Sequence, residues 1–234
     1  MKKLLIMMLA LSTTAMAQDE LGWSGKGALG YVSQSGNADT QTLSIGADAV
    51  NNMEKWRYSL GLKILQSESD DVDTADRFEL YGQVDYKVDE KSYWLGTLRY
   101  DDDEFSQFES QLTATVGYGR VLVDSESNKL KGEIGLGVRR AEERISGDSD
   151  TEAIARGVLG YQHIFSETAS LTNDLLVESG SDNTFVKNIT ALNADIAGDF
   201  GLQVAYEIRH NTDVADGIDK TDRVSSINLV YAIK

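Results

Sequence analysis

The chain has 234 residues, with no cysteine, no proline and 21 glycines, and its formal net charge at pH 7 is −16. Without cysteine it can form neither disulfides nor thiolate metal sites, and an acidic chain with no basic patch repels nucleic acid. Proline is kept out of sheet interiors, so its absence beside many glycines favours an extensive β-sheet.

Residues 1–17 have the features of a secretory signal peptide. Two lysines precede an apolar run at 4–11, which is too short to cross a bilayer as a helix, and Ala15-Met16-Ala17 supplies the small-x-small cleavage pattern. We therefore expect these residues to be removed after export. The remaining chain, residues 18–234, shows no linker or composition shift and is expected to form one domain.

Apolar and polar residues alternate along this domain, which predicts β-strands with one apolar face. In the segment 54–67, for example, Trp56, Tyr58 and Leu60 lie on one face and Arg57 lies on the other. Such segments recur between turn signals, and the eighth to tenth alternate least clearly, so ten strands are the alternative to twelve. In chain order the segments are 22–34, 39–51, 54–67, 75–88, 91–101, 106–122, 128–142, 151–165, 169–179, 184–197, 200–211 and 221–234.

Aromatic residues and polar faces indicate that the apolar faces meet lipid. The polar faces are crowded with Gly, Ser, Thr, Gln and charged residues, as in a narrow polar lumen. Aromatic side chains fall near strand ends, where the two girdles of a membrane barrel lie. These aromatic residues are Trp23, Tyr31, Trp56, Trp94, Tyr100, Phe165 and Tyr231.

The connections between the segments alternate in length, which is typical of short periplasmic turns and longer outer loops. The short ones are 51–54, 89–91, 166–168 and 198–199, and the longer, acidic ones are 68–76, 101–106, 142–152 and 211–222. The sequence thus predicts an all-β, antiparallel, up-and-down transmembrane β-barrel of about 12 strands in the cell outer membrane. A soluble periplasmic β-barrel is the alternative architecture.

The interior of this predicted barrel carries charges of both signs. Such a mixture predicts ion pairs between neighbouring strands that narrow the lumen, and wide porins need about 16–18 strands. The residues expected to face inward are Arg57, Lys63, Arg77, Glu79, Asp85, Lys87, Arg99, Lys131, Glu133, Arg139, Arg156, Glu207 and Arg209.

Several stretches along the mature chain resemble the YdiY-like family, described as salt-induced outer-membrane proteins and otherwise of unknown function. The resemblance implies a barrel in the outer membrane, and it implies no reaction or substrate. The matching stretches are Gly22-Trp23-Ser24-Gly25, Ser35-Gly36-Asn37-Ala38-Asp39-Thr40, Lys55-Trp56-Arg57, residues 98–106, Gly117-Tyr118-Gly119, Gly180-Ser181-Asp182-Asn183-Thr184, Arg209-His210-Asn211-Thr212-Asp213-Val214 and Lys220-Thr221-Asp222.

The acidic loops are the main functional signal of the sequence. Clustered carboxylates attract monovalent cations and bind divalent ones such as calcium and magnesium, yet no spacing here defines a metal site. The simpler interpretation is a solvated face that keeps the loops out of the membrane, or one that is bridged to lipopolysaccharide by divalent cations. The clustered residues are Glu68, Asp70, Asp71, Asp73 and Asp76, then Asp101, Asp102, Asp103 and Glu104, then Asp213, Asp216, Asp219 and Asp222.

Only His163 and His210 could serve as an imidazole base. His163 has apolar neighbours on its strand and is expected to be structural, whereas His210 lies at a loop edge near Asp213. Ser179 and Ser181, at another loop edge, are the seryl candidates for a hydrolytic dyad with it.

The sequence therefore favours a non-enzymatic outer-membrane barrel, with no catalytic, cofactor-binding or metal-ligating residue assigned. Its leading function is a narrow, cation-favouring pore linked through the resemblance to salt or osmotic response. The alternative is a barrel hydrolase acting on lipid or peptide with His210 as base. Expected partners are outer-membrane lipid, lipopolysaccharide, the barrel assembly machinery and cations.

Overall fold

The structure, a computed structural model, describes residues 21–34, 40–70, 72–144, 146–215 and 218–233. The expected signal peptide at 1–17 lies outside these residues. Among them, no helix is long and apolar enough to cross a membrane. The described chain forms twelve strands, which are β1 (Gly22–Gln34), β2 (Thr40–Asn52), β3 (Trp56–Ser69), β4 (Val72–Lys87), β5 (Ser92–Asp103), β6 (Phe108–Asp124), β7 (Asn128–Glu143), β8 (Ser149–Ser166), β9 (Ala169–Ser179), β10 (Thr184–Ala197), β11 (Phe200–Asn211) and β12 (Thr221–Ile233).

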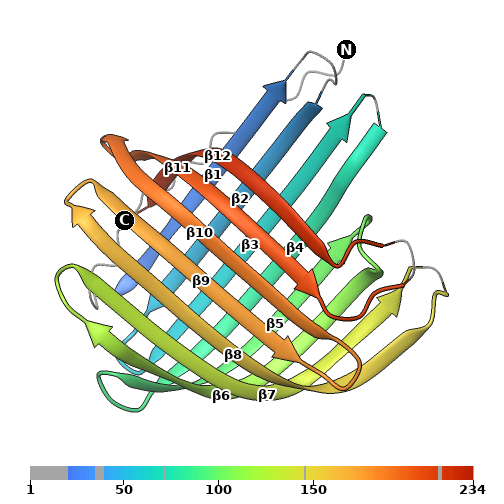
Figure 1. Cartoon of the computed structure of the whole chain (residues 1–234). Coiled ribbons are helices and arrows are strands. Elements are labelled where there is room, and N and C mark those ends of the chain that lie inside the picture. Colours follow the sequence, from blue (N-terminus) through green and yellow to red (C-terminus); the bar gives the residue numbers. More distant parts are fainter. Residues whose placement is uncertain (1–20, 35–39, 71, 145, 216–217, 234) are drawn as a thin grey trace.

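The strands form one closed, antiparallel, up-and-down barrel. Each strand pairs with its neighbours in the chain, and β12 returns to pair with β1. In Figure 1 the strands are steeply inclined, and β1–β4 (blue to cyan) lie behind β9–β12 (orange to red). The predicted fold is confirmed. The ten-strand alternative is wrong, because β8, β9 and β10 are paired along their lengths.

Side chains alternate between the lumen and the outside, as the period of two predicts. On β4, Arg77, Glu79 and Asp85 are buried, whereas Leu80 and Tyr86 point outward and are exposed. Successive Cβ atoms of a strand point to opposite faces, so one sequence builds both a polar interior and an apolar exterior. The buried interior of the described barrel is accordingly more polar than apolar.

Large apolar side chains cover the outside of the barrel. Leu60, Val116, Ile134 and Leu136 are each more than half exposed, an arrangement that is unfavourable in water and suits contact with lipid. Aromatic rings form cross-strand pairs on the outside. Three lie toward the turn end, with centroids 5.0 Å apart for Trp56–Tyr86, 5.5 Å for Trp94–Tyr118 and 4.7 Å for Phe200–Tyr231, and Phe78–Tyr100, at 6.3 Å, lies nearer the loop end.

One end of the barrel, here called the turn end, carries tight connections at 53–55, 88–91, 125–127, 167–168 and 198–199. In the β4–β5 turn the Lys91 N–H donates to Asp89 Oδ1 at 2.8 Å, and this hydrogen bond lowers the pKa of the Asp89 carboxyl. The first strand, β1, begins at this end at Gly22, and the last strand, β12, ends here at Ile233.

The opposite end, here called the loop end, is less extended than the sequence predicts. The prediction of a long loop at 68–76 is wrong, because β3 continues to Ser69 and β4 begins at Val72. Asp70 lies in the turn between them, with a φ of 51°. Strand pairing satisfies the backbone hydrogen-bonding groups whether or not the side chains are apolar. The polar residues here therefore continue the hydrogen-bonded strands. After β4, the connections at this end span 104–107, 144–148, 180–183 and 212–220.

Candidate functional site in the barrel lumen

Charged residues follow the inner faces of the strands toward the loop end. On β5, Arg99, Asp101 and Asp103 occupy alternate positions, so all three point inward, with 5%, 5% and 7% of their surface exposed. Two residues that the sequence analysis assigned to an acidic loop are therefore strand residues inside the barrel. The prediction that Asp101 and Asp103 lie at an open mouth is wrong.

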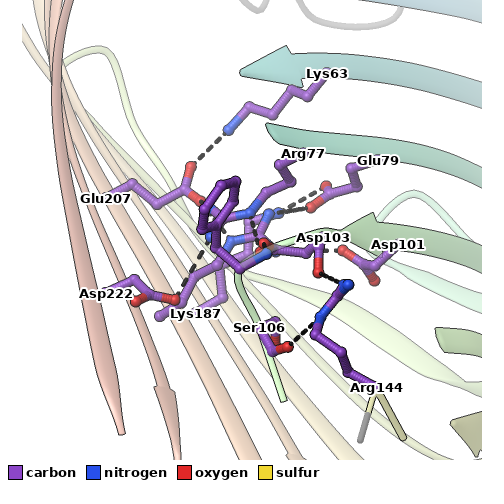
Figure 2. A network of polar contacts seen from close by, with 12 residues as sticks. Lys63, Arg77, Glu79, Asp101, Asp103, Ser106, Arg144, Lys187, Glu207 and Asp222 are labelled. Carbon is purple, nitrogen blue, oxygen red and sulfur yellow. Dashed lines mark hydrogen bonds and ion pairs between the residues drawn. The ribbon is translucent and has the colours of Figure 1, made fainter. Parts of the chain in front are cut away.

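These side chains join others to form an ion-pair network that crosses the lumen (Figure 2). Lys187 on β10 places its Nζ 2.5 Å from Glu79 Oε2 on β4, and Arg209 on β11 places its Nη2 2.6 Å from the same oxygen. β4 is separated from β10 and β11 by many strands in either direction around the barrel. The shared carboxylate of Glu79 thus links opposite walls.

Further ion pairs extend this network around the interior. We call the set the outer ion-pair network; it comprises Lys63, Arg77, Glu79, Arg99, Asp101, Asp103, Glu178, Lys187, Glu207, Arg209 and Asp222. Its other N–O distances are 2.5 Å for Arg77–Asp103, 2.5 Å for Arg99–Glu178, 2.7 Å for Arg209–Glu207, 2.9 Å for Lys63–Glu207, 3.1 Å for Arg99–Asp101, 3.3 Å for Arg209–Asp101, 3.5 Å for Arg77–Asp222 and 3.7 Å for Arg77–Glu207.

Loops at the same end of the barrel are joined to one another by hydrogen bonds. Arg144 donates from Nη2 to the carbonyl oxygen of Asp103 at 2.6 Å and from Nε to that of Ser106 at 3.1 Å. The backbone N–H of Ala215 donates to Gln107 Oε1 at 2.5 Å, which ties the β11–β12 loop to the β5–β6 loop. The network and these loop contacts together obstruct the axial path at the loop end.

A second group of polar side chains lies nearer the turn end, on one wall formed by β3–β8. Glu133 accepts hydrogen bonds from Tyr93 Oη at 2.8 Å and from Arg156 Nη1 at 2.9 Å. Arg57 places its Nη2 2.6 Å from Asp85 Oδ2 and lies over the Tyr93 ring, 5.0 Å from its centroid. Tyr93 lies against the wall because its strand neighbour is Gly119, where any Cβ would overlap the ring. This group narrows the lumen without crossing it.

Open space remains on the turn-end side of the outer ion-pair network. A cavity of about 460 Å³ occupies the lumen, and a second of about 850 Å³ lies at the turn end, lined by Lys91, Asp124 and other charged residues. The two cavities share Lys131, Thr172 and Asp174 in their walls. The lumen is therefore accessible from the turn end, and the outer ion-pair network lies across it toward the loop end.

The inward orientation predicted for the lumen charges agrees with the structure, but the predicted pairing is incomplete. Arg57–Asp85 and Arg139–Glu152 join neighbouring strands as expected. The cross-lumen contacts of Glu79 and the roles of Glu178 and Lys187 were not foreseen. Their inward orientation follows from the strand alternation; the partner on the opposite wall does not, because it depends on barrel closure.

The structure does not assemble the hydrolytic dyad of the alternative function. His210 Nδ1 lies 2.8 Å from Thr221 Oγ1, and Ser181 Oγ donates to Glu152 at 3.4 Å. Ser179 shares a hydrogen bond of 3.0 Å with Thr184 on β10. His163 lies beside Asn128 Oδ1 at 2.9 Å, consistent with the structural role expected for it.

The expected acidic clusters are dispersed over several elements. Glu68, Asp73 and Asp76 lie on strands, and Asp222 on β12 pairs with Arg77. Asp71 and Asp216 lie outside the described residues. Across the part of the chain that the structure describes, no group of three or more His, Cys, Asp or Glu is arranged to hold a metal ion.

A closed antiparallel barrel with an apolar belt, aromatic strand ends and a polar lumen is an outer-membrane β-barrel, and the cell outer membrane is where this protein resides. The chain belongs to the family described as "Protein of unknown function, DUF481", whose model matches residues 27–233. It is 24% identical over 205 residues to the uncharacterized protein YdiY of Escherichia coli (strain K12), covering 87% of this chain and 81% of that protein. The predicted resemblance is thereby confirmed.

Solved structures of low sequence identity share the fold. The NanC porin has a TM-score of 0.53 at 12% identity, covering 91% of this chain and 100% of that one. The translocator domain of the autotransporter NalP from Neisseria meningitidis has 0.53 at 9%, covering 92% and 89%. An outer membrane channel from Pseudomonas putida F1 has 0.51 at 9%, covering 92% and 96%. Barrels of this kind thus include porins and channels.

Proposed function

We propose that the protein is a non-enzymatic, narrow outer-membrane pore that conducts when its outer ion-pair network opens. The observation that carries the proposal is the contact of Lys187 and Arg209 with Glu79 across the lumen, beyond cavities of about 460 and 850 Å³. Removing one partner of a buried ion pair costs about 3–5 kcal/mol, because the other charge stays buried. The network is thus stable while complete and sensitive to any single loss.

The charge at the loop end supports a preference for cations. Glu104, Asp213 and Asp219 are exposed there, beyond the nearly balanced charges of the network. A negative mouth raises the local concentration of cations, and this effect weakens with salt because the Debye length falls from about 30 Å at 0.01 M to about 3 Å at 1 M. Cation preference is therefore expected to be strongest at low ionic strength.

The same electrostatics gives a physical basis for a response to salt. Within the network, two ion pairs have one partner that is about half exposed, Lys63 at 46% in Lys63–Glu207 and Asp222 at 49% in Arg77–Asp222. Of these two, the Arg77–Asp222 pair is the longer, at 3.5 Å against 2.9 Å, so screening ions should weaken it most readily. We propose that rising ionic strength loosens this pair first and so favours the open state. This is the link to salt or osmotic response implied by the family resemblance.

The outer surface of the barrel suggests which molecules surround it. Outer-membrane lipid contacts the apolar belt. Lipopolysaccharide, bridged by divalent cations to outward carboxylates such as Asp102 and Glu142, is a proposed partner at the loop end. The barrel assembly machinery is the proposed partner during insertion.

Single-channel recording in planar bilayers tests the pore directly. Glu79→Gln leaves Lys187 and Arg209 facing a neutral amide, so their mutual repulsion should open the network and raise the open probability several-fold. Glu142→Gln removes one charge from an exposed position and is the matched control, expected to behave as wild type. Equal behaviour of the two variants, or no conductance in either, contradicts the proposal. His210→Ala should leave conductance unchanged.

A further inference from the structure

The seam that closes the barrel is incomplete on its loop-end side. β1 and β12 are paired from Gly25–Ile233 to Gly30–Asn228 and no further. Beyond this point β1 remains paired with β2 as far as Gln34–Thr40, and β12 remains paired with β11 as far as Thr221–His210. The facing edges of the two strands therefore separate above Asn228, while each keeps its other neighbour.

This opening begins at the apolar belt. Leu29 and Tyr31 on β1 and Ile227 on β12 are all more than half exposed and flank it on the outside. On the next strand, Val204 pairs with Ile227, and the outward positions Tyr206 and Ile208 continue the belt past the opening. Toward the loop end the next outward positions of β12 are Ser225 and Arg223, so only the first part of the separated edges lies beside apolar side chains and faces lipid. Unpaired strand edges are unfavourable in that environment unless something covers them.

The lumen cavity of about 460 Å³ extends to the strands that flank this opening. Val224 and Ser226 of β12 and Ala28 of β1 line this cavity from beside the seam. Its wall combines small or apolar side chains, including Ile189, Ala191, Ala205 and Val230, with charged residues of the outer ion-pair network. A volume of this size falls within the range of about 300–1,000 Å³ found for small-molecule sites, which are mostly apolar with a few placed polar groups.

Two lysines provide polar groups in the same cavity. Ala28, Gly46 and Lys63 are aligned in one register row across β1, β2 and β3, so Lys63 lies at the level of the seam. Lys26 lies one inward position closer to the turn end, 3.4 Å from Asp48, and its side chain is 51% exposed. Lys63 is 46% exposed. Both side chains retain accessible surface beside their carboxylate partners, which an anionic head group could contact.

We propose that the lumen cavity is a lateral binding site for a fatty acid, which enters from the membrane between β1 and β12. The alkyl chain lies along Ala28, Val224 and the apolar wall, and its carboxylate lies near Lys26 and Lys63. The surrounding leaflet supplies acyl chains at high local concentration, and the axial path is obstructed by the outer ion-pair network. The site stands independently of whether the barrel conducts ions.

Photolabelling of the purified barrel in phosphatidylcholine vesicles tests this site. The probe is dodecanoic acid carrying a diazirine, and the matched probe is the corresponding alcohol. We expect the acid to label lumen-facing positions such as Ala28 and Ser226, and Lys26→Gln with Lys63→Gln to lower labelling by the acid several-fold more than labelling by the alcohol. Labelling confined to outward residues such as Leu29 would overturn the proposal.

Disulfide locking tests the route of entry, since the chain has no cysteine of its own. Continuing the seam register would bring Val32 opposite Ser226, so Val32→Cys with Ser226→Cys should close the opening when oxidised. Leu29→Cys with Leu229→Cys lies three residues along, in the part already paired and outside the cavity lining, and is the control. We expect oxidation of the first pair alone to reduce labelling by the acid at least tenfold, and reduction to restore it.

Equal labelling of the two locked variants overturns lateral entry. If the Val32 and Ser226 cysteines do not oxidise, Ser226→Trp narrows the same opening from its inner side and should give the same loss. Unchanged labelling in Ser226→Trp then contradicts the route.

Discussion

The Glu79 carboxylate forms ion pairs with two cationic side chains from the opposite wall of the barrel, Lys187 and Arg209, and both contacts are shorter than 3 Å. In this buried position the exchange of one side chain changes the balance of charge across the lumen. Outward positions favour apolar side chains instead, because an exposed leucine there contacts lipid and a charge is unfavourable. A charged side chain is therefore tolerated at a lumen-facing position and destabilising at the adjacent lipid-facing position of the same strand.

Leu60 and Ser59 on β3 test this rule at the residue scale. Leu60 is 58% exposed on the outside, and Ser59 faces the lumen. Leu60→Arg should lower the free energy of unfolding by about 2–4 kcal/mol near the bilayer midplane, whereas Ser59→Arg should have a smaller effect. Urea titration in lipid vesicles measures both values, and equal losses would mean that the faces are assigned wrongly.

At the scale of the strands, alternation predicts where the strands lie and which face each residue takes, but it predicts the strand ends less well. Polar residues at 68–76 suggest a loop by composition, yet they continue the β3–β4 ladder to a turn at Asp70. Side chains beyond the lipid no longer need to be apolar, so composition changes before pairing stops. For the same reason Asp101 and Asp103 looked like loop residues and are lumen residues.

Epitope insertions distinguish turns, loops and strand ends. An epitope in 144–148 or 180–183 should be accessible to antibody on intact cells, and one in 88–91 or 125–127 should not, because longer loops of such barrels face outward. An insertion after Asp73, inside β4, should instead lower the amount of heat-modifiable barrel. The reverse labelling pattern would contradict the orientation.

At the scale of the whole molecule, the sequence alone gives the barrel, its approximate strand number and the sign of each face, since these follow from a period of two. It does not give the candidate site. Contacts such as Lys187–Glu79 join residues 108 positions apart, and only the closed barrel brings them together. The incomplete β1–β12 seam has no sequence signal for a similar reason, because it depends on how the first and last strands meet.

The central claim is a closed barrel with lipid outside and a polar lumen within. Single cysteines placed from 77 to 86 on β4, each carrying a spin label in lipid vesicles, measure this directly by oxygen and water-soluble nickel accessibility. Oxygen collisions should peak at Phe78, Leu80, Val84 and Tyr86, with a period of two, and be low at the alternate positions. Oxygen maxima at Arg77, Glu79 and Asp85, or no period of two, would contradict the account.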